Sequence, residues 1–424
     1  MGRRLRVAVV GYGTGGQATA LLLSRDGHGV EVFERTPTLG PVGAGFLLQP
    51  VGQRVLWELD LLDSVMRHGA VVERLYGETA AGRPVMDMRY AELDARLFGL
   101  GVQRGALFSI LDSAWTERRT LHCGVHITQV DTEACAVVDS TGRRYEGFDL
   151  IVVADGAAST LRDQVATAQL DRPYPWGAQW CLIPAEDWPW REVLQQRYAG
   201  ARRMIGMLPV GTRPGDPVPR LSFFWSMPAA ELSRPIDIAA WREDVGRLWP
   251  DALKRLADAE LPQSLAAARY RDTVHTRWQR GCAVLLGDAA HAMSPQLGQG
   301  VNMALLDALC LRDVLRKEGS LEHAIDRFVT ERRRHVGIYH FWSRWLTPLF
   351  QSERDGWARM RDLTFHPLSR MPFGRGQMLR VLSGTRRGWL GTVTMPDAFL
   401  RALEGCRSLP AAKGAMEESA LHEH

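Results

Sequence analysis

A glycine-rich turn close to the start of the chain is the feature that most constrains its fold. The turn reads Gly11-Tyr-Gly-Thr-Gly-Gly16 and follows the apolar, β-branched run Val7 to Val10. Such a run is typical of a buried parallel strand. Small residues from Ala18 to Leu23 predict a helix after the turn, and Val30 to Phe33 predicts a second strand. This arrangement predicts the β-α-β unit of a dinucleotide-binding domain.

Each glycine of the turn has a physical reason to be there. Gly11 permits the tight turn, Gly13 lets a pyrophosphate approach the backbone, and Gly16 lets helix and strand pack closely. The phosphates then lie at a helix N-terminus, whose free N–H groups and dipole favour anions. Glu34 ends the second strand and is placed to accept hydrogen bonds from both ribose hydroxyls. Because a carboxylate would repel a 2′-phosphate, we expect FAD or NAD here rather than NADP. The alternative is a glycine turn in an ordinary β-α-β unit.

Two further motifs place polar turns at the ends of apolar strands. The run Leu150 to Val153 precedes Asp155-Gly156, and the run Ala283 to Leu286 precedes Gly287-Asp288. Open α/β sheets bind ligands at the carboxyl ends of their strands, although Asp-Gly alone is also a common turn dipeptide. The last motif continues into a glycine-rich loop, 295–302, which enters a new helix at about Gly300. Unpaired N–H groups at that helix start favour negative charge.

The composition excludes several other classes of protein. The 424 residues are 46% hydrophobic and 24% charged, with a net charge of +4, which is typical of a soluble globular protein. So small a charge gives no reason to expect a nucleic-acid partner. The first strand leaves no room for a signal peptide, and no apolar stretch approaches the ~18 residues of a membrane span. We expect a cytoplasmic protein without an integral span. Peripheral membrane contact through the Trp-rich C-terminal part stays open as an alternative that the sequence does not support.

The cysteines and histidines indicate no metal site. The six cysteines are scattered and form no Cys-x-x-Cys pair. His122 and His126 are four residues apart, but Gly124 and the strand-like flanks do not suit a helical ligand pair. We therefore expect reduced cysteines and no bound metal.

Together the three motifs, in this order and spacing, resemble those of the p-hydroxybenzoate hydroxylase-like, single-component (class A) FAD-dependent monooxygenases. The resemblance covers roughly residues 5–345. It implies an α/β fold with a Rossmann-like FAD-binding domain, an inserted mainly β substrate domain and C-terminal helices. It also implies non-covalent FAD, NADH or NADPH as co-substrate, and O2. A C4a-hydroperoxyflavin would then hydroxylate an aromatic or related small organic substrate. We expect a monomer or homodimer.

Changes in composition and in the pattern of apolar residues along the chain suggest where the domain boundaries lie. Many tryptophans, prolines and alternating strand-like runs mark 171–276 as the inserted substrate domain, to which we add strands at 76–100. The FAD-binding domain then comprises 1–75, 101–170 and 277–345, and a C-terminal helical region with a loose tail follows at 346–424.

The resemblance also assigns residues to the cofactor. Asp155 and Gly156, with Ser159 and Arg162, map to a segment that serves both FAD and pyridine nucleotide in the family, and Asp288 maps to a ribityl contact. The whole set expected to bind FAD is Gly11, Gly13, Thr14, Gly15, Gly16, Glu34, Arg35, Arg104, Asp155, Gly156, Asp288, Pro295, Gly298, Gln299, Gly300, Val301 and Asn302.

The sequence identifies no catalytic residue, but three positions are candidates, each with a plainer alternative. His291 follows Asp288 by three residues, where the family commonly has a structural histidine. Gln49 either faces the flavin or substrate or is a surface amide. Trp225 lies on a strand of the inserted unit, where the family floors its substrate pocket, whereas the other tryptophans are expected in the core.

Other functions stay open as alternatives. Flavin halogenases have the same fold, and Trp188-Pro-Trp190 is similar to their Trp-x-Trp-x-Ile-Pro motif, but Arg191-Glu192 follows in place of the expected continuation. Prenyl reductases, oxidases and epoxidases of this fold are further alternatives. A non-catalytic FAD-binding protein is another, against which the intact Asp155, Asp288 and 298–302 argue.

Overall fold

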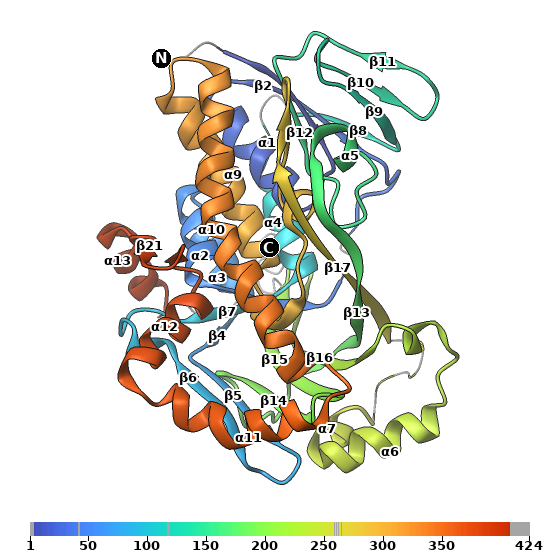
Figure 1. Ribbon diagram of the computed structural model, residues 1–424, viewed down its shortest axis with the longest axis vertical. Helices are drawn as coiled ribbons and strands as arrows, with labels where there is room; N and C mark the ends of the chain where they lie inside the picture. The colour runs from blue at the N-terminus through green and yellow to red at the C-terminus, as the bar shows by residue number, and fades with distance from the viewer. Residues whose placement is uncertain are drawn as a thin grey trace, which may run out of the picture.

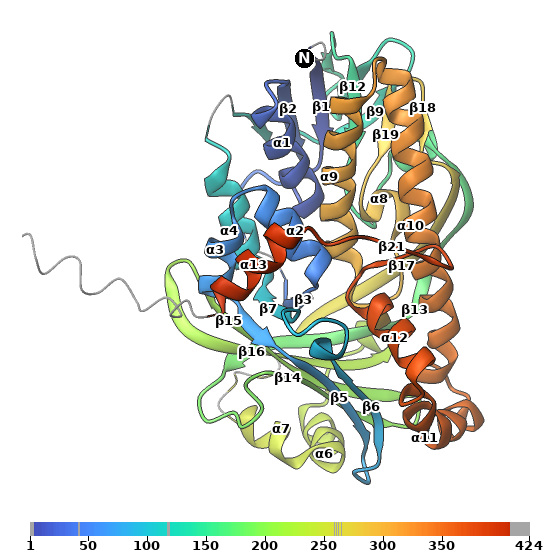
Figure 2. The ribbon, with the colours of Figure 1, turned by 90° about the vertical axis from the view of Figure 1, so that its left-hand side faces the viewer.

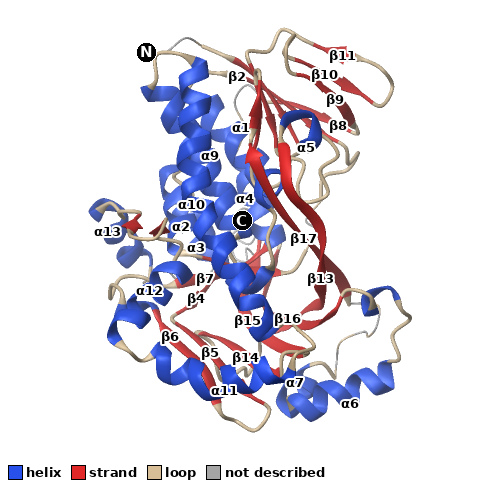
Figure 3. Cartoon of the chain, in the orientation of Figure 1, coloured by secondary structure: helices blue, strands red, loops and turns tan. Residues whose placement is uncertain are grey.

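Two large β-sheets organise the molecule (Figure 1; Figure 3). The computed structural model describes residues 4–40, 43–116, 119–257, 259, 261, 263 and 265–407. A six-stranded sheet lies at the top of Figure 1 and a seven-stranded sheet at the bottom. The long strands β13 (Thr167–Pro184) and β17 (Ala266–Arg277) belong to the seven-stranded sheet and run up toward the other one.

The six-stranded sheet brings the three sequence motifs to one edge. Its order is β18-β19-β12-β1-β2-β8, and it is parallel apart from the β18–β19 pair. Its strands are β1 (Arg6–Val10), β2 (Gly29–Glu34), β8 (Thr120–Cys123), β12 (Leu150–Val153), β18 (Gln279–Arg280) and β19 (Ala283–Leu285). Because β1, β12 and β19 are parallel neighbours, the turns that follow them meet at the carboxyl edge, where such sheets bind ligands.

Both faces of the six-stranded sheet are covered, so its central strands are apolar throughout. Helices α1 (Thr14–Arg25) and α9 (Gly300–Lys317) pack together on one side. The small sheet β11-β10-β9, made of Arg144–Tyr145, Ala136–Asp139 and Ile127–Asp131, covers the other side, where Tyr145 packs on Phe33 with ring centroids 4.8 Å apart. Val7 and Leu150 have no exposed surface as a result.

The seven-stranded sheet has the order β17-β13-β16-β15-β14-β5-β6 and is antiparallel except between β14 and β5. Its other strands are β5 (Arg74–Thr79), β6 (Pro84–Arg89), β14 (Val193–Ala199), β15 (Arg203–Arg213) and β16 (Asp216–Pro228). Figure 2 shows α6 (Ile238–Leu248) and α7 (Pro250–Arg255) below this sheet and the nucleotide-binding part above it. The sheet therefore has one face toward each.

The remaining elements connect and cover these sheets. The strands are β3 (Gly45–Leu48), β4 (Ala70–Val72), β7 (Gly99–Gln103), β20 (Arg386–Arg387) and β21 (Gly391–Thr392). The helices are α2 (Pro50–Glu58), α3 (Leu62–His68), η1 (Tyr90–Glu92), α4 (Arg104–Ala114), α5 (Arg162–Val165), η2 (Glu231–Ser233), α8 (Asp288–His291), η3 (Pro295–Leu297), α10 (Leu321–Phe350), α11 (Asp355–Ser369), α12 (Pro372–Leu382) and α13 (Asp397–Cys406). Helix α10 passes residue 345, where we drew a domain boundary, without a break. In the described part of the chain, no helix is both long and apolar enough to cross a membrane, and no cluster of side chains suits a metal ion.

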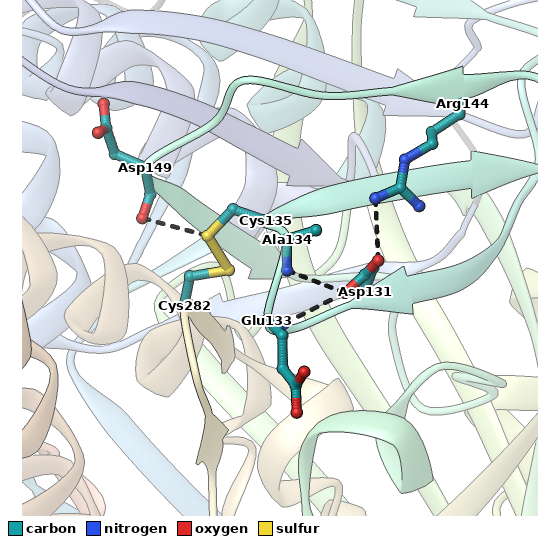
Figure 4. The surroundings of a disulfide bond; sticks show 7 residues. All are labelled: Asp131, Glu133, Ala134, Cys135, Arg144, Asp149 and Cys282. Carbon is teal, nitrogen blue, oxygen red and sulfur yellow. Dashed lines mark hydrogen bonds and ion pairs between the residues drawn. A yellow bond between two sulfur atoms is a disulfide. The ribbon is translucent and has the colours of Figure 1, made fainter.

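A disulfide between Cys135 and Cys282 corrects the expectation that all cysteines are reduced (Figure 4). The two residues are 147 positions apart in the sequence, which is why no spacing pattern reveals the pair. The turn between β9 and β10 folds over the start of β19, and the N–H of Cys282 donates to the carbonyl of Thr132 at 3.2 Å. This contact brings the two Cα atoms to 5.9 Å, within the range that a disulfide requires.

Candidate active site

The glycines of the first turn divide into those required by the protein and one that leaves space open. Gly11 has φ +101°, a left-handed value that glycine adopts without cost. A Cβ on Gly16 would lie 2.0 Å from the carbonyl oxygen of Gly11, so only glycine fits there. A Cβ on Gly13 would meet no atom within 4 Å. Gly13 is also the N-cap of α1 and has no side chain to bond the free N–H groups, which leaves an open anion-binding surface.

Glu34 lies beside this turn, as the sequence predicts, and both of its oxygens have backbone partners. One oxygen accepts from the N–H of Tyr12 at 2.8 Å and the other from the N–H of Thr36 at 2.9 Å. The carboxylate therefore holds the glycine turn against the end of β2. A carboxylate accepts more than one hydrogen bond per oxygen, so this placement is compatible with ribose hydroxyls as further donors.

The carboxylates of the other two motifs stand at the same edge of the sheet. Asp155 has a buried Oδ1 with no hydrogen-bond partner among the described residues. Burial raises the pKa of Asp155, and the Ser159 hydroxyl and the charge of Arg162 only partly offset this. Asp288 begins α8 and is exposed. Its Oδ1 lies 3.5 Å from the position of a Cβ on Gly300, so it borders the start of α9.

Arg162 clasps the Asp-Gly and Gly-Asp turns together instead of facing outward. Only 2% of the residue is exposed. Its Nε donates to the carbonyl of Ala289 at 3.1 Å, its Nη2 donates to the carbonyl of Ala157 at 2.9 Å, and its Nη1 pairs with Asp171 at 3.0 Å. The side chain that the resemblance links to the nucleotide-binding segment is thus committed to positioning that segment.

The loop before α9 is held by its own amide side chains. Gln299 donates from Nε2 to the carbonyl of Leu382 at 2.7 Å, and also contacts that of Val381. Asn302, which is fully buried, accepts from the N–H of Gln49 at 2.8 Å and donates to the carbonyl of Leu47 at 3.2 Å. These side chains fix the loop, so what the loop offers a ligand is its backbone. Gly298, with φ +60° and no atom within 4 Å of a Cβ, is its most open point.

His291 lies behind the Gly-Asp turn and not in front of it. Its Nε2 is 2.6 Å from Asp307, and the residue is 1% exposed. Asp307 also accepts from Arg332 and from the N–H of Gly287, so one carboxylate ties three elements together. Burial alone would raise the pKa of Asp307, but His291 and Arg332 outweigh it and lower the pKa to about 2. This placement favours the structural alternative for His291.

Gln49 is neither a surface amide nor free to turn. It is 1% exposed, and its side-chain oxygen accepts from the hydroxyl of Tyr90 at 2.7 Å. The surface alternative is therefore wrong for this residue.

Trp225 faces away from the nucleotide-binding part, so our expectation about its direction needs correction. It is 3% exposed and packs in the core that Phe223 and Trp241 also occupy, against α6 and α7. Successive residues of a strand point to opposite faces. Ser226, the next residue, points the other way and accepts from Gln351 at the end of α10, at 2.8 Å. Phe224 shares that face by alternation and is only partly buried.

A polar cluster, which we call the Tyr174 cluster, connects the loop before α9 to this face of the sheet. Gln296 of η3 donates to the Tyr174 hydroxyl at 2.9 Å, and that hydroxyl donates to Gln351 at 2.8 Å. Gln351 in turn bonds Ser226. Burial raises the pKa of Tyr174, so the phenol is protonated at neutral pH.

Tyr270 of β17 is a second phenol on this side of the molecule. Burial raises its pKa, while the charge of Arg104 lowers it and Tyr174 raises it further. Tyr270 therefore stands near both the predicted FAD contact Arg104 and the Tyr174 cluster. Our sequence reasoning missed Tyr174, Tyr270, Phe224, Gln296 and Gln351. The two-residue alternation of the long strands was the one signal available, and it needs a fixed register to be used.

The residues at the edge of the six-stranded sheet fit FAD. The open points at Gly13 and Gly298 leave room for a ligand against the backbone. The starts of α1 and α9 have no side-chain caps, so their N–H groups are available to phosphates and to a flavin ring carrying negative charge. The unpartnered oxygen of Asp155 is a buried acceptor that lacks a donor.

Comparison with known proteins agrees with this assignment. The family model described as "FAD binding domain" matches residues 4–337. The FAD-dependent urate hydroxylase of Klebsiella oxytoca is 27% identical over 350 residues, covering 77% of this chain and 86% of that protein. The 6-hydroxynicotinate 3-monooxygenase of Pseudomonas fluorescens is 26% identical over 353 residues, with coverage of 77% and 86%.

Solved structures show the same fold. Klebsiella pneumoniae HpxO complexed with FAD and uric acid superposes with a TM-score of 0.76 at 23% identity, over 91% of this chain and 98% of that chain. The tetrameric form of 2-methyl-3-hydroxypyridine-5-carboxylic acid oxygenase gives a TM-score of 0.73 at 24% identity, over 91% and 98%. With the match to the family model over most of its length, the chain belongs to the p-hydroxybenzoate hydroxylase-like FAD-dependent monooxygenases and is an oxidoreductase.

Proposed function

We propose that this protein uses NADH or NADPH and O2 to hydroxylate a small aromatic molecule bound between the loop before α9 and the upper face of the seven-stranded sheet. The observation that carries the proposal is the Tyr174 cluster, which joins that loop to the face bearing Phe224. The curated relatives, among them enzymes named for urate and 6-hydroxynicotinate, support the substrate class.

The side chains on this face suit a flat, partly polar ring. Phe224 supplies an apolar surface, and aromatic rings pack favourably on one another. Tyr174 and Tyr270 have raised pKa values, so each keeps its proton at neutral pH. The Tyr174 hydroxyl donates that proton to Gln351, so Tyr174 can only accept a hydrogen bond from a substrate, whereas the Tyr270 hydroxyl can donate one to a substrate oxygen or nitrogen. In these roles Tyr174 orients the substrate and Tyr270 orients and polarises it, and neither phenol removes a proton from it.

The residues that we expect to bind FAD have a separate role, which is to hold and position the cofactor. When bound, FAD would supply the redox chemistry that the side chains of the chain cannot perform. Gly13 and the start of α1 would hold its pyrophosphate, Asp288 a ribityl hydroxyl, and the backbone of 298–302 the flavin ring. Arg162, Gln299 and Asn302 keep these groups in place through the bonds described above.

The halogenase alternative finds no support at the residues that suggested it. Trp188 is 2% exposed and packs with Trp190 and Trp249 in the core against α6 and α7, on the far side of the sheet from Phe224. We therefore retain hydroxylation.

A labelled-oxygen experiment tests the proposal. The FAD-loaded protein is mixed with NADH or NADPH and with a panel of hydroxylated aromatic acids and N-heterocycles under ¹⁸O₂. We expect one panel member to accelerate NAD(P)H oxidation and to acquire one ¹⁸O atom. A product with a reduced double bond, a product that requires halide, or label found only in hydrogen peroxide would overturn the proposal.

A further inference from the structure

Large hydrophobic side chains are exposed in only one part of the described chain. All of them lie between Phe341 and Leu390, in α10, in α11, at the start of α12 and in the turn between β20 and β21. The same fifty residues contain nine arginines, no lysine and three acidic residues, a net charge of +6 against +4 for the whole chain. Arg361 and Arg386 are buried, and Arg344, Arg375 and Arg387 pair with acidic residues outside this segment, so the excess charge at its surface comes from the other arginines. Exposed apolar surface and these arginines lie together on the right-hand side of Figure 2, where α11 is the lowest element.

Helix α11 has its apolar side turned outward. Trp357, Met360 and Leu368 follow one another at helical spacing and are 43%, 41% and 57% exposed, and Leu363 lies beside them. In an ordinary surface helix this side would face the core. An exposed apolar stripe of this kind marks an interaction surface.

The buried side of α11, which borders the stripe at Trp357 and Leu368, explains why the helix cannot rotate to bury that stripe. Arg361 is 1% exposed, and its guanidinium lies over the rings of Tyr198 at 4.8 Å and Phe350 at 5.0 Å. It also donates to the carbonyls of Leu349 at 2.9 Å and Gly200 at 3.1 Å. Rotation would break these bonds and leave buried carbonyls without donors, which is costly. The outward stripe is therefore fixed by the fold.

A second apolar group lies at the turn between β20 and β21. Leu390 is 92% exposed and Trp389 is 64% exposed, and Trp389 packs on Phe341 of α10 with ring centroids 4.8 Å apart. Trp345 follows Phe341 one helical turn later and is 49% exposed. Tryptophan side chains at this kind of exposure are typical of the boundary between lipid and water.

The charges beside the stripe select the partner. Arg359 and Arg370, with His366 between them, follow the helix at positions that share one side, next to Leu363. Neither Arg359 nor Arg370 forms an ion pair within 4 Å among the described residues, and the nearby Asp355 pairs with Arg202 instead. A symmetric pairing of two copies would bring two positively charged surfaces together, which is unfavourable. A partner surface that has an apolar interior and negatively charged groups at its boundary matches both the apolar stripe and the arginines.

We propose that α11 and the β20–β21 turn dock this protein on the surface of a bilayer that contains anionic lipid. The apolar stripe and Leu390 enter the headgroup region, and the arginines contact lipid phosphates. The docking is peripheral and needs no spanning helix. It is independent of the reaction proposed above.

Vesicle co-sedimentation of the full-length holoprotein tests this proposal. With vesicles of phosphatidylcholine plus about 30% phosphatidylglycerol we expect binding that pure phosphatidylcholine does not give and that about 1 M salt weakens. The double variant Trp357→Ser/Leu368→Ser and the charge reversal Arg359→Glu/Arg370→Glu should each bind roughly tenfold or more weakly. Trp389→Ser/Leu390→Ser tests the turn in the same way.

Arg234→Glu is the matched control, because Arg234 is an exposed arginine in the loop before α6, outside this region. We expect it to bind like the parent, and all variants to melt within about 2 °C of the parent. The proposal is overturned if the parent does not sediment with anionic vesicles, or if the stripe and charge variants bind as tightly as Arg234→Glu. It is also overturned if light scattering shows a parent dimer that the stripe variant converts to monomer while vesicle binding is absent. In that case a second copy covers the surface.

Discussion

The edge of the six-stranded sheet and the upper face of the seven-stranded sheet form the two sides of the site that we propose, and they differ in what they offer a ligand. At the edge, the surface offered to a ligand is mostly backbone, with open glycines at Gly13 and Gly298 and uncapped helix starts. On the face, the surface is made of side chains, chiefly Phe224, Tyr174 and Tyr270.

This difference determines which substitutions each region can accept. A backbone surface recognises phosphates and a flavin ring by close approach, so any added side chain at an open glycine competes with the ligand. A side-chain surface can change its shape and hydrogen bonding by substitution without moving the strands that carry it. In the cofactor region, single glycines therefore cannot be replaced without loss of binding. In the proposed substrate region, what matters is which alternate residues of each strand face the ligand. Four predictions test this contrast, in order of expected effect.

The largest effect is expected from Gly16→Ala, compared with Gly13→Ala. The new methyl at position 16 would overlap the carbonyl of Gly11, so we expect little folded, flavin-containing protein. The methyl at position 13 meets no protein atom, so the variant should melt like the parent but bind FAD about 1–3 kcal/mol more weakly. Thermal melting and FAD titration of both proteins distinguish the two effects. Equal behaviour of the two variants would contradict the distinction.

Trp225→Ala and Phe224→Ala should separate stability from substrate binding within one strand. Trp225 is almost fully buried, so its truncation should cost about 3–5 kcal/mol of unfolding free energy. Phe224→Ala should cost less and should instead raise KM for the substrate that the labelled-oxygen experiment identifies. Urea unfolding and steady-state kinetics measure the two quantities. A Trp225→Ala protein with parental stability and a raised KM would restore Trp225 as a substrate residue.

Asp307 should make the free energy of unfolding depend on pH in the acid range, an effect that the glycines of the cofactor region cannot have. Its pKa of about 2 lies below the ordinary value of 3.8, so its ionised form stabilises the fold above about pH 4. That contribution, about 2 kcal/mol, should disappear as the pH falls from 4 toward 2. The check is the difference in unfolding free energy between the parent and Asp307→Asn, measured by urea at several pH values. A difference that stays constant below pH 4 would refute this.

The smallest effect is expected from Asp288→Asn, which tests a side chain within the backbone-built region. Asparagine keeps an acceptor at this exposed position and removes only the charge. Loss of charge assistance in one hydrogen bond should weaken FAD binding by about 1 kcal/mol, without a change in melting temperature of the FAD-free protein. FAD titration followed by flavin fluorescence measures this. Parental affinity would remove Asp288 from the cofactor contacts.

The turns at the sheet edge were predictable because each is encoded by adjacent residues, an apolar strand followed by Gly-x-Gly, Asp-Gly or Gly-Asp. The side chains that line the upper face of the seven-stranded sheet were not predictable from the sequence. In the run Leu221 to Trp225 both Phe224 and Trp225 are large and aromatic. The sequence therefore does not say which of the two points toward the six-stranded sheet and which points toward α6 and α7. Pairing of β16 with β13 and β15 decides it. The disulfide and the bond from Gln299 to Leu382 join residues that are 147 and 83 positions apart, and no local pattern encodes such contacts.

The order of strands in the six-stranded sheet also has a consequence for the growing chain on the ribosome. β1 is made first, but its neighbour β12 appears about 140 residues later and β19 more than 130 residues after that. At a synthesis rate of about 5–20 residues per second, β1 waits on the order of tens of seconds before β19 exists. Gln299 finds its partner carbonyl only once Leu382 has left the exit tunnel. We therefore expect FAD to be captured only after Leu382 has emerged, so a nascent chain stalled before residue 382 should carry no tightly bound flavin.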